Sequence, residues 1–130
     1  MNKLLIDTNV YSQAMAGDKT VISTLRRLHH IGISIISIGE LLSGFKGGKH
    51  EKKNRNELNQ FLDSPRVQFY SLDENSAEYY SAILNQLKKQ GTPIPTNDIW
   101  IGATAFQQGL PVYTFDKHFF HIKGLILNSQ

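Results

Sequence analysis

The chain has 130 residues, of which 40% are hydrophobic and 19% charged, so it can bury a core and is not disordered by composition. It contains no cysteine, which excludes disulfides and thiolate metal sites, and its formal net charge of +3 permits a polyanionic partner without requiring one. We expect a single domain over residues 1–130. No apolar run approaches the roughly 20 residues of a membrane helix, so a cytoplasmic protein with no membrane association is expected.

Short apolar runs alternate with helical patterns along the first half of the chain. Lys3–Ile6 is an apolar run that predicts a buried strand. Asp18 is placed to cap the helix that follows it, because apolar residues recur there at helical spacing. Residues 33–36 form a second, β-branched run, after which Ser37 is expected to begin a helix that ends at Gly47.

The same alternation continues after that helix. A polar helix follows, with its apolar residues on one side, and Pro65 is expected to close it. Residues 67–70 predict a third strand, because they combine β-branched and aromatic side chains. The next helix is expected to be capped by Asp73 or Ser76 and to end at Gly91.

The C-terminal part adds one more helix and two strands. Thr96 is expected to cap a helix that ends at Gly109, and residues 111–115 and 125–127 predict the fourth and fifth strands. The strand runs are apolar without polar alternation, which indicates a sheet covered on both faces. The sequence therefore predicts an α/β domain with a mostly parallel sheet.

Four acids occur where the expected strands end or the expected helices begin. Asp7 and Asp116 directly follow the first and fourth strands, while Glu40 and Asp98 lie near the starts of helices. Ligand sites of parallel sheets lie outside the carboxyl ends of the strands, so all four are expected at one edge. Clustered carboxylates repel one another, and their oxygen ligands suit Mg²⁺ or Mn²⁺. In a basic protein such a site favours phosphodiester hydrolysis.

Each acid also has a structural explanation. Ser37 followed by Glu40 forms a capping-box pattern, Asp98 suits the positive end of its helix, and Asp116 is placed to cap a turn. Asp7 is the hardest to explain in this way, because a carboxylate beside a buried strand is costly unless it is paired or metal-bound. It is the four acids together that predict a cation site.

Two further features have alternative interpretations. The basic stretch of residues 46–55 is either a phosphate-contacting surface beside the site or a solvated helix face. His118 and His121 have a spacing that suits a metal ion on a helix. No third nitrogen or sulfur ligand is evident near them in the sequence, which disfavours a zinc site.

Four segments resemble the acidic motifs of PIN-domain nucleases, and they occur in the same order. The segments are residues 5–10 (LIDTNV), 37–41 (SIGEL), 97–105 (NDIWIGATA) and 114–119 (TFDKHF). One such motif alone would be weak evidence, whereas four in order are fairly specific. The order and the total length resemble the VapC-type toxins of bacterial toxin–antitoxin pairs.

This resemblance implies a PIN-like three-layer α/β/α sandwich with five strands, dependence on Mg²⁺ or Mn²⁺, and endonucleolytic cleavage of RNA. It also implies a cognate antitoxin protein and a homodimer. The residues that take on site roles by this resemblance are the catalytic, metal-binding acids Asp7, Glu40, Asp98 and Asp116, and the supporting residues Thr114 and Asn9.

Three other functions are compatible with parts of the sequence. The first is a housekeeping RNA-processing PIN nuclease. The second is a metal-dependent phosphatase with Asp7 as nucleophile, but that chemistry usually has a second aspartate two residues on, where this chain has Asn9. The third is a catalytically inactive RNA-binding module, which the four intact acids disfavour.

Overall fold

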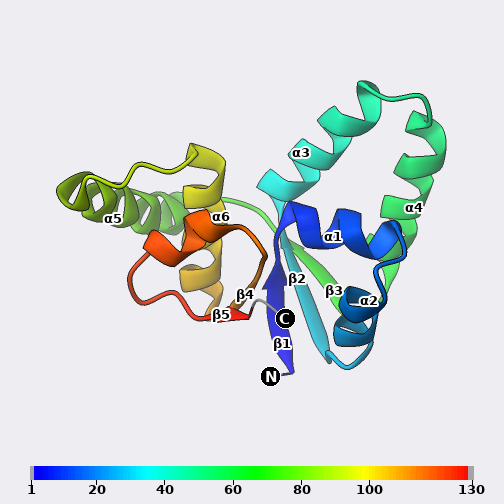
Figure 1. Ribbon diagram of the computed structural model, residues 1–130, viewed down its shortest axis with the longest axis horizontal. Helices are drawn as coiled ribbons and strands as arrows, with labels where there is room; N and C mark the ends of the chain where they lie inside the picture. Colours follow the sequence, from blue (N-terminus) through cyan, green and yellow to red (C-terminus); the bar gives the residue numbers. More distant parts are fainter. Residues whose placement is uncertain (1, 129–130) are drawn as a thin grey trace.

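The computed structural model describes residues 2–128, which form a five-stranded sheet with helices on both faces (Figure 1). All four strand pairings are parallel, and the order β3-β2-β1-β4-β5 places the first strand at the centre. The expected α/β class and five-stranded parallel sheet are confirmed. In chain order the elements are β1 (Lys3–Ile6), α1 (Thr8–Met15), α2 (Lys19–Arg26), β2 (His30–Ser34), α3 (Ile35–Lys46), α4 (Glu51–Asp63), β3 (Val67–Tyr70), α5 (Glu74–Gln90), α6 (Thr96–Gln108), β4 (Val112–Tyr113), the 3-10 helix η1 (Lys117–His121) and β5 (Leu127–Asn128).

Helices α1 to α4 cover one face of the sheet, and α5, α6 and η1 cover the other (Figure 1). The central strand shows this division residue by residue. Leu4 and Ile6 pack with α1 to α4, whereas Leu5 packs with α5 and α6. All three side chains are fully buried, so β1 has apolar residues on both faces, as expected of a parallel sheet between two helical layers.

The helix after β2 begins three residues earlier than expected. Ser34 ends the strand, and its Oγ accepts the backbone N–H of Ile36, so Ser34 and not Ser37 caps α3. Ser37 lies inside α3 and is fully buried, and Glu40 lies in the second turn. The expected capping box of Ser37 and Glu40 was therefore wrong. The β-branched run suggested a strand over residues 33–36, but β2 spans His30–Ser34 and its pairing with β1 ends at Ile33.

Two short helices that the sequence did not predict follow acids at strand ends. Asp7 caps α1 and Asp116 caps η1, because a side-chain oxygen of each accepts a backbone N–H in the first turn. The expectation for α6 was also wrong in detail. Thr96 is the first residue of α6, and Pro95 occupies the cap position without a side-chain hydrogen bond.

Other boundaries agree with the local signals. Asp18 caps α2, and Asp73 caps α5 in a reciprocal capping box with Ser76. Gly91 and Gly109 end α5 and α6 with φ of 70° and 65°, a left-handed conformation that favours glycine. The last two strands are shorter than expected, with two residues each. None of the helices within residues 2–128 has the length and apolar character that crossing a membrane requires.

Candidate active site

The register of the central strands brings two acid-bearing segments together. Ile6 of β1 pairs with Tyr113 of β4, so the residues that follow these strands lie side by side. The Thr114 hydroxyl donates a hydrogen bond to Asp7 Oδ2, and Thr114 Oγ1 accepts the backbone N–H of Asp116 at 2.9 Å. Thr114 thus connects two of the predicted acids by hydrogen bonds.

Asp7 is the most deeply buried of the four acids, with 4% of its surface exposed. Its Oδ1 accepts the backbone N–H of Val10 at 3.0 Å, and its Oδ2 accepts the hydrogen bond from Thr114. Burial raises the pKa of Asp7 above the ordinary value, and both hydrogen bonds partly oppose that rise. Each oxygen of an ionised carboxylate has two lone pairs, so these bonds leave Asp7 able to bind a cation.

Glu40 reaches the same region from α3. Its Oε1 accepts the Thr8 hydroxyl at 2.5 Å, and its Oε2 accepts the Asn97 side-chain amide at 3.2 Å. Glu40 is therefore held by the first turns of α1 and α6, and neither of these two hydrogen bonds caps a helix. Sequence reasoning missed Thr8 and Asn97, although each directly adjoins a predicted acid, which was the available signal.

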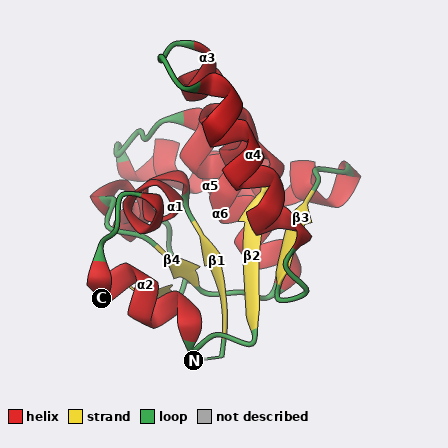
Figure 2. Ribbon diagram, turned by 90° about the vertical axis from the view of Figure 1, so that its right-hand side faces the viewer, coloured by secondary structure: helices red, strands yellow, loops and turns green. Residues whose placement is uncertain are grey.

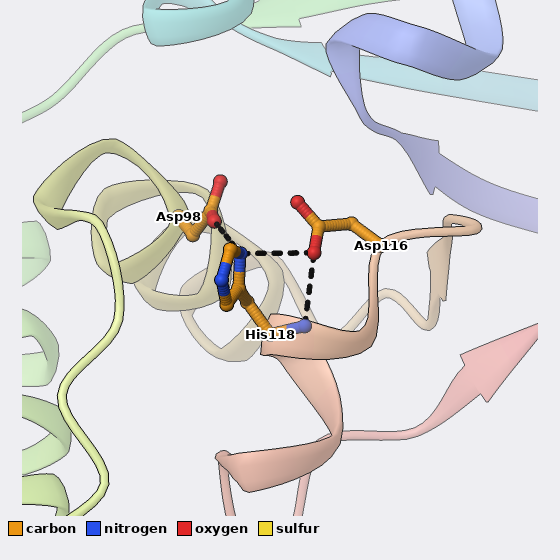
Figure 3. A group of neighbouring side chains, drawn as sticks. All are labelled: Asp98, Asp116 and His118. Atoms are coloured by element: carbon orange, nitrogen blue, oxygen red, sulfur yellow. Dashed lines mark hydrogen bonds and ion pairs between the residues drawn. The ribbon is translucent and has the colours of Figure 1, made fainter.

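Asp98 and Asp116 meet at the imidazole of His118 (Figure 3). Nδ1 of His118 lies 2.9 Å from Asp116 Oδ1 and 3.3 Å from Asp98 Oδ2. Burial raises the pKa of Asp98 to about 6; the charge of Asp116 adds to that rise, and His118 opposes it. His118 was not among the predicted site residues, because its interpretation as part of a histidine pair with His121 directed attention away from the acids.

All four predicted acids line one cavity of about 370 Å³, together with Asn9, Asn97 and His118. Within residues 2–128, no lysine or arginine forms an ion pair with any of the four acids. Four carboxylates with one histidine partner carry an excess of negative charge, which a hard divalent cation with oxygen ligands would balance. The donor set therefore fits such an ion.

Comparison with known proteins shows the family of this chain. The sequence profile of the family described as the PIN domain matches residues 4–125, a range that contains all four acids. The chain belongs to the PIN domain family. The matched range extends from β1 to the segment before β5, so the similarity of this chain to the family includes both helical layers of the fold.

This PIN domain is similar over nearly its whole length to proteins named as VapC ribonucleases. It is 34% identical to Ribonuclease VapC1 of Rickettsia felis over 94% of this chain and 92% of that protein. It is 32% identical to Ribonuclease VapC1 of Methanocaldococcus jannaschii over 94% of this chain and 82% of that protein. Among solved structures, VapBC2 of Rickettsia felis bound to a promoter DNA fragment matches with a TM-score of 0.90 and 25% identity, over 98% of both chains. The resemblance to VapC-type PIN ribonucleases is thereby confirmed.

We expect Asp98→Asn to stabilise the metal-free PIN domain at about pH 7.5. The pKa of Asp98 is raised from its ordinary value of 3.8 to about 6 in the folded protein, so the folded state loses stability as the pH rises from about 4 to about 6. Above that window the loss is complete, and removing the carboxylate should recover about 1 kcal/mol, or a few degrees in Tm, after allowance for solvent screening.

Thermal melting of both proteins in EDTA, at about pH 4 and about pH 7.5, measures this effect. The variant's advantage should be present at the higher pH and largely absent at the lower one, because at about pH 4 Asp98 is protonated in the folded state and is already partly protonated in the unfolded state. An advantage of equal size at both pH values would show that charge at Asp98 is not its cause.

Proposed function

We propose that this PIN domain is a metal-dependent endoribonuclease that hydrolyses phosphodiester bonds of cytoplasmic RNA and is the toxin of a type II toxin–antitoxin pair. The observation that carries the proposal is the convergence of Asp7, Glu40, Asp98 and Asp116 on one cavity. These acids come from four separate segments of the chain and still meet at the carboxyl edge of the sheet. The relatives named as ribonucleases support the same reaction.

In this proposal the four acids bind Mg²⁺ or Mn²⁺. Such an ion supplies an activated water and offsets charge on the phosphate. The chain's own contribution is to hold the ligands before the ion arrives. Thr114 fixes one oxygen of Asp7, while Thr8 and Asn97 fix the two oxygens of Glu40. Because these bonds hold the carboxylates in place, the site needs little rearrangement to bind an ion.

The positive charge of the hairpin formed by α3 and α4 is an argument for RNA as the substrate. Residues 46–57 contain five lysine or arginine and two glutamate residues, a net charge of +3, which equals that of the whole chain. The hairpin extends beyond the carboxyl edge of the sheet (Figure 2), and Asp7 and Asp116 follow β1 and β4 at that edge. We propose that it contacts RNA phosphates, because a polyanion needs a cationic surface near an acidic site.

We further propose a cognate antitoxin and a homodimer. The similar structure from Rickettsia felis is named as a VapBC assembly, and structures with the same fold include a toxin–antitoxin complex from Klebsiella pneumoniae. An antitoxin that places an arginine in the cavity would be held by the negative charge of the four carboxylates and by bidentate hydrogen bonds to one of them. The homodimer follows from the family resemblance and from the prevalence of two-fold assemblies.

Expression in a bacterial host tests the biological role. The chain alone should stop growth, and co-expression of the small open reading frame beside its gene should restore growth through a stable complex of the two proteins. Asp98→Asn should be harmless when expressed to the same level, because it lacks one of the metal-binding acids. A chain that cleaves RNA in vitro, yet is harmless alone and binds no neighbour, would be better described as a housekeeping RNA-processing nuclease.

Glu40→Gln should lower the rate of RNA cleavage by about tenfold or more. Glutamine keeps the length of the side chain but removes its charge and replaces one acceptor oxygen with a donor amide. A capping role would tolerate glutamine, yet Ser34 already caps α3. Initial rates on a structured RNA measure the effect, with Glu78→Gln on the exposed surface of α5 as control. A fully active variant would return Glu40 to a structural role.

A further inference from the structure

Three side chains converge at one corner of the cavity, and one of them is a histidine (Figure 3). One potential ligand atom from each of Asp98, Asp116 and His118 lies within 4.8 Å of the other two. Nδ1 of His118 is 2.9 Å from one carboxylate and 3.3 Å from the other. A six-coordinate ion with bonds of about 2.1 Å places adjacent ligand atoms about 3.0 Å apart. The two separations therefore match neighbouring positions around one ion.

We propose that Asp98, Asp116 and His118 form a mixed nitrogen–oxygen metal site, and that His118 makes it prefer Mn²⁺ over Mg²⁺. The proposal rests on the proposed function and adds a nitrogen ligand to its four acids. Mg²⁺ is bound almost entirely through oxygen, whereas first-row transition metals also accept imidazole. Mn²⁺ combines both properties, because it binds carboxylates well and tolerates a nitrogen ligand.

The backbone of η1 holds the imidazole in place. The backbone N–H of His118 donates a hydrogen bond to Asp116 Oδ1 at 2.9 Å. This bond keeps the imidazole ring beside Asp116, the acid two residues before it. Phe119, the next residue, is 1% exposed and packs in the core beneath α5 and α6, which anchors η1. The His118 side chain is 48% exposed, so a hydrated ion can reach Nδ1 from solvent.

A hydrogen-bonding role for His118 would give the same distances without any metal bond. In that case the imidazole would only hold Asp98 and Asp116 in position, with their other oxygens free for the ion. The two roles respond differently to His118→Asn. The asparagine amide can donate a hydrogen bond from a position close to that of Nδ1, but it is a poor metal ligand.

Electron paramagnetic resonance of Mn²⁺ bound to the intact protein, without RNA, separates the two roles. We expect spin-echo spectra of the wild type to show coupling to a bound nitrogen. His118→Asn and His118→Ala should both lose this coupling and bind Mn²⁺ about tenfold more weakly. Mg²⁺ affinity, measured by competition, should change by less than about threefold. His121→Ala is the matched control, because His121 lies in the same short helix with an exposed side chain and does not line the cavity.

Wild-type spectra without nitrogen coupling would overturn the proposal, as would wild-type Mn²⁺ affinity in His118→Asn. Equal losses of Mn²⁺ and Mg²⁺ affinity would also overturn it, because they would show a positioning role for His118. Cleavage of RNA by the same wild-type preparation tests the proposed function separately. The binding measurement contains no RNA, so a failure of the nitrogen ligand and a failure of the nuclease function give different results.

Discussion

Asp98→Asn should lower the rate of RNA cleavage by at least about a hundredfold while leaving the fold intact. The amide has nearly the shape of the carboxylate, but it removes a negative charge from a cavity that collects four of them. Asp98 lies in the first turn of α6 and lines the cavity, and asparagine is tolerated in a first turn, so the helix should be unaffected. Single-turnover cleavage of RNA, together with circular dichroism, measures activity and fold on the same sample.

Asp7→Asn should have an effect of similar size for the same reason. The asparagine oxygen can still accept the N–H that caps α1, and its amide can donate to the Thr114 hydroxyl, so α1 and β4 should stay in place. Asp63→Asn is the control, because Asp63 is exposed at the end of α4 and outside the cavity. Near-wild-type cleavage by either cavity variant would remove that acid from the proposed metal site.

Removal of divalent metal ions should abolish RNA cleavage, and Mg²⁺ or Mn²⁺ should restore it. No lysine or arginine within the described part of the chain pairs with the four acids, so neither type of side chain is in position to take the place of the ion. Without an ion the cavity repels the phosphate instead of binding it. The loss of cleavage activity on metal removal should therefore be at least as large as the loss caused by replacing any single acid.

Chelation with excess EDTA, followed by dialysis and titration with each ion, measures this requirement. Restoration by Mn²⁺ at lower concentration than by Mg²⁺ would agree with the nitrogen ligand proposed above. Undiminished cleavage after exhaustive chelation would contradict the metal-dependent mechanism and leave the four acids without their proposed role. A matched titration with NaCl separates metal binding from screening of the RNA contacts.

Much of this protein was determined by its sequence alone, because the signals concerned are local. Caps such as Asp18 and Asp73 act on backbone N–H groups within three residues, so chain spacing specifies them. The apolar strand runs predicted a covered parallel sheet, and parallel strands place their carboxyl ends at one edge. The common location of Asp7, Glu40, Asp98 and Asp116 followed from those two facts without coordinates.

The partners of those acids were decided only by the tertiary structure. Thr114 and Asp7 are 107 residues apart, and Glu40 and Asn97 are 57 apart. Their contacts depend on the strand order that places β4 beside β1, which no spacing along the chain encodes.

The start of α3 and the partners of His118 were decided in the same way. Two serines three residues apart could each cap α3, and the register of β2 against β1 selected Ser34. His118 looked like one of a histidine pair, but the short helix η1 turns its ring towards Asp98, an acid contributed by a different helix. Residue spacing specifies contacts within one helical turn, whereas contacts between distant segments exist only once the sheet has brought those segments together.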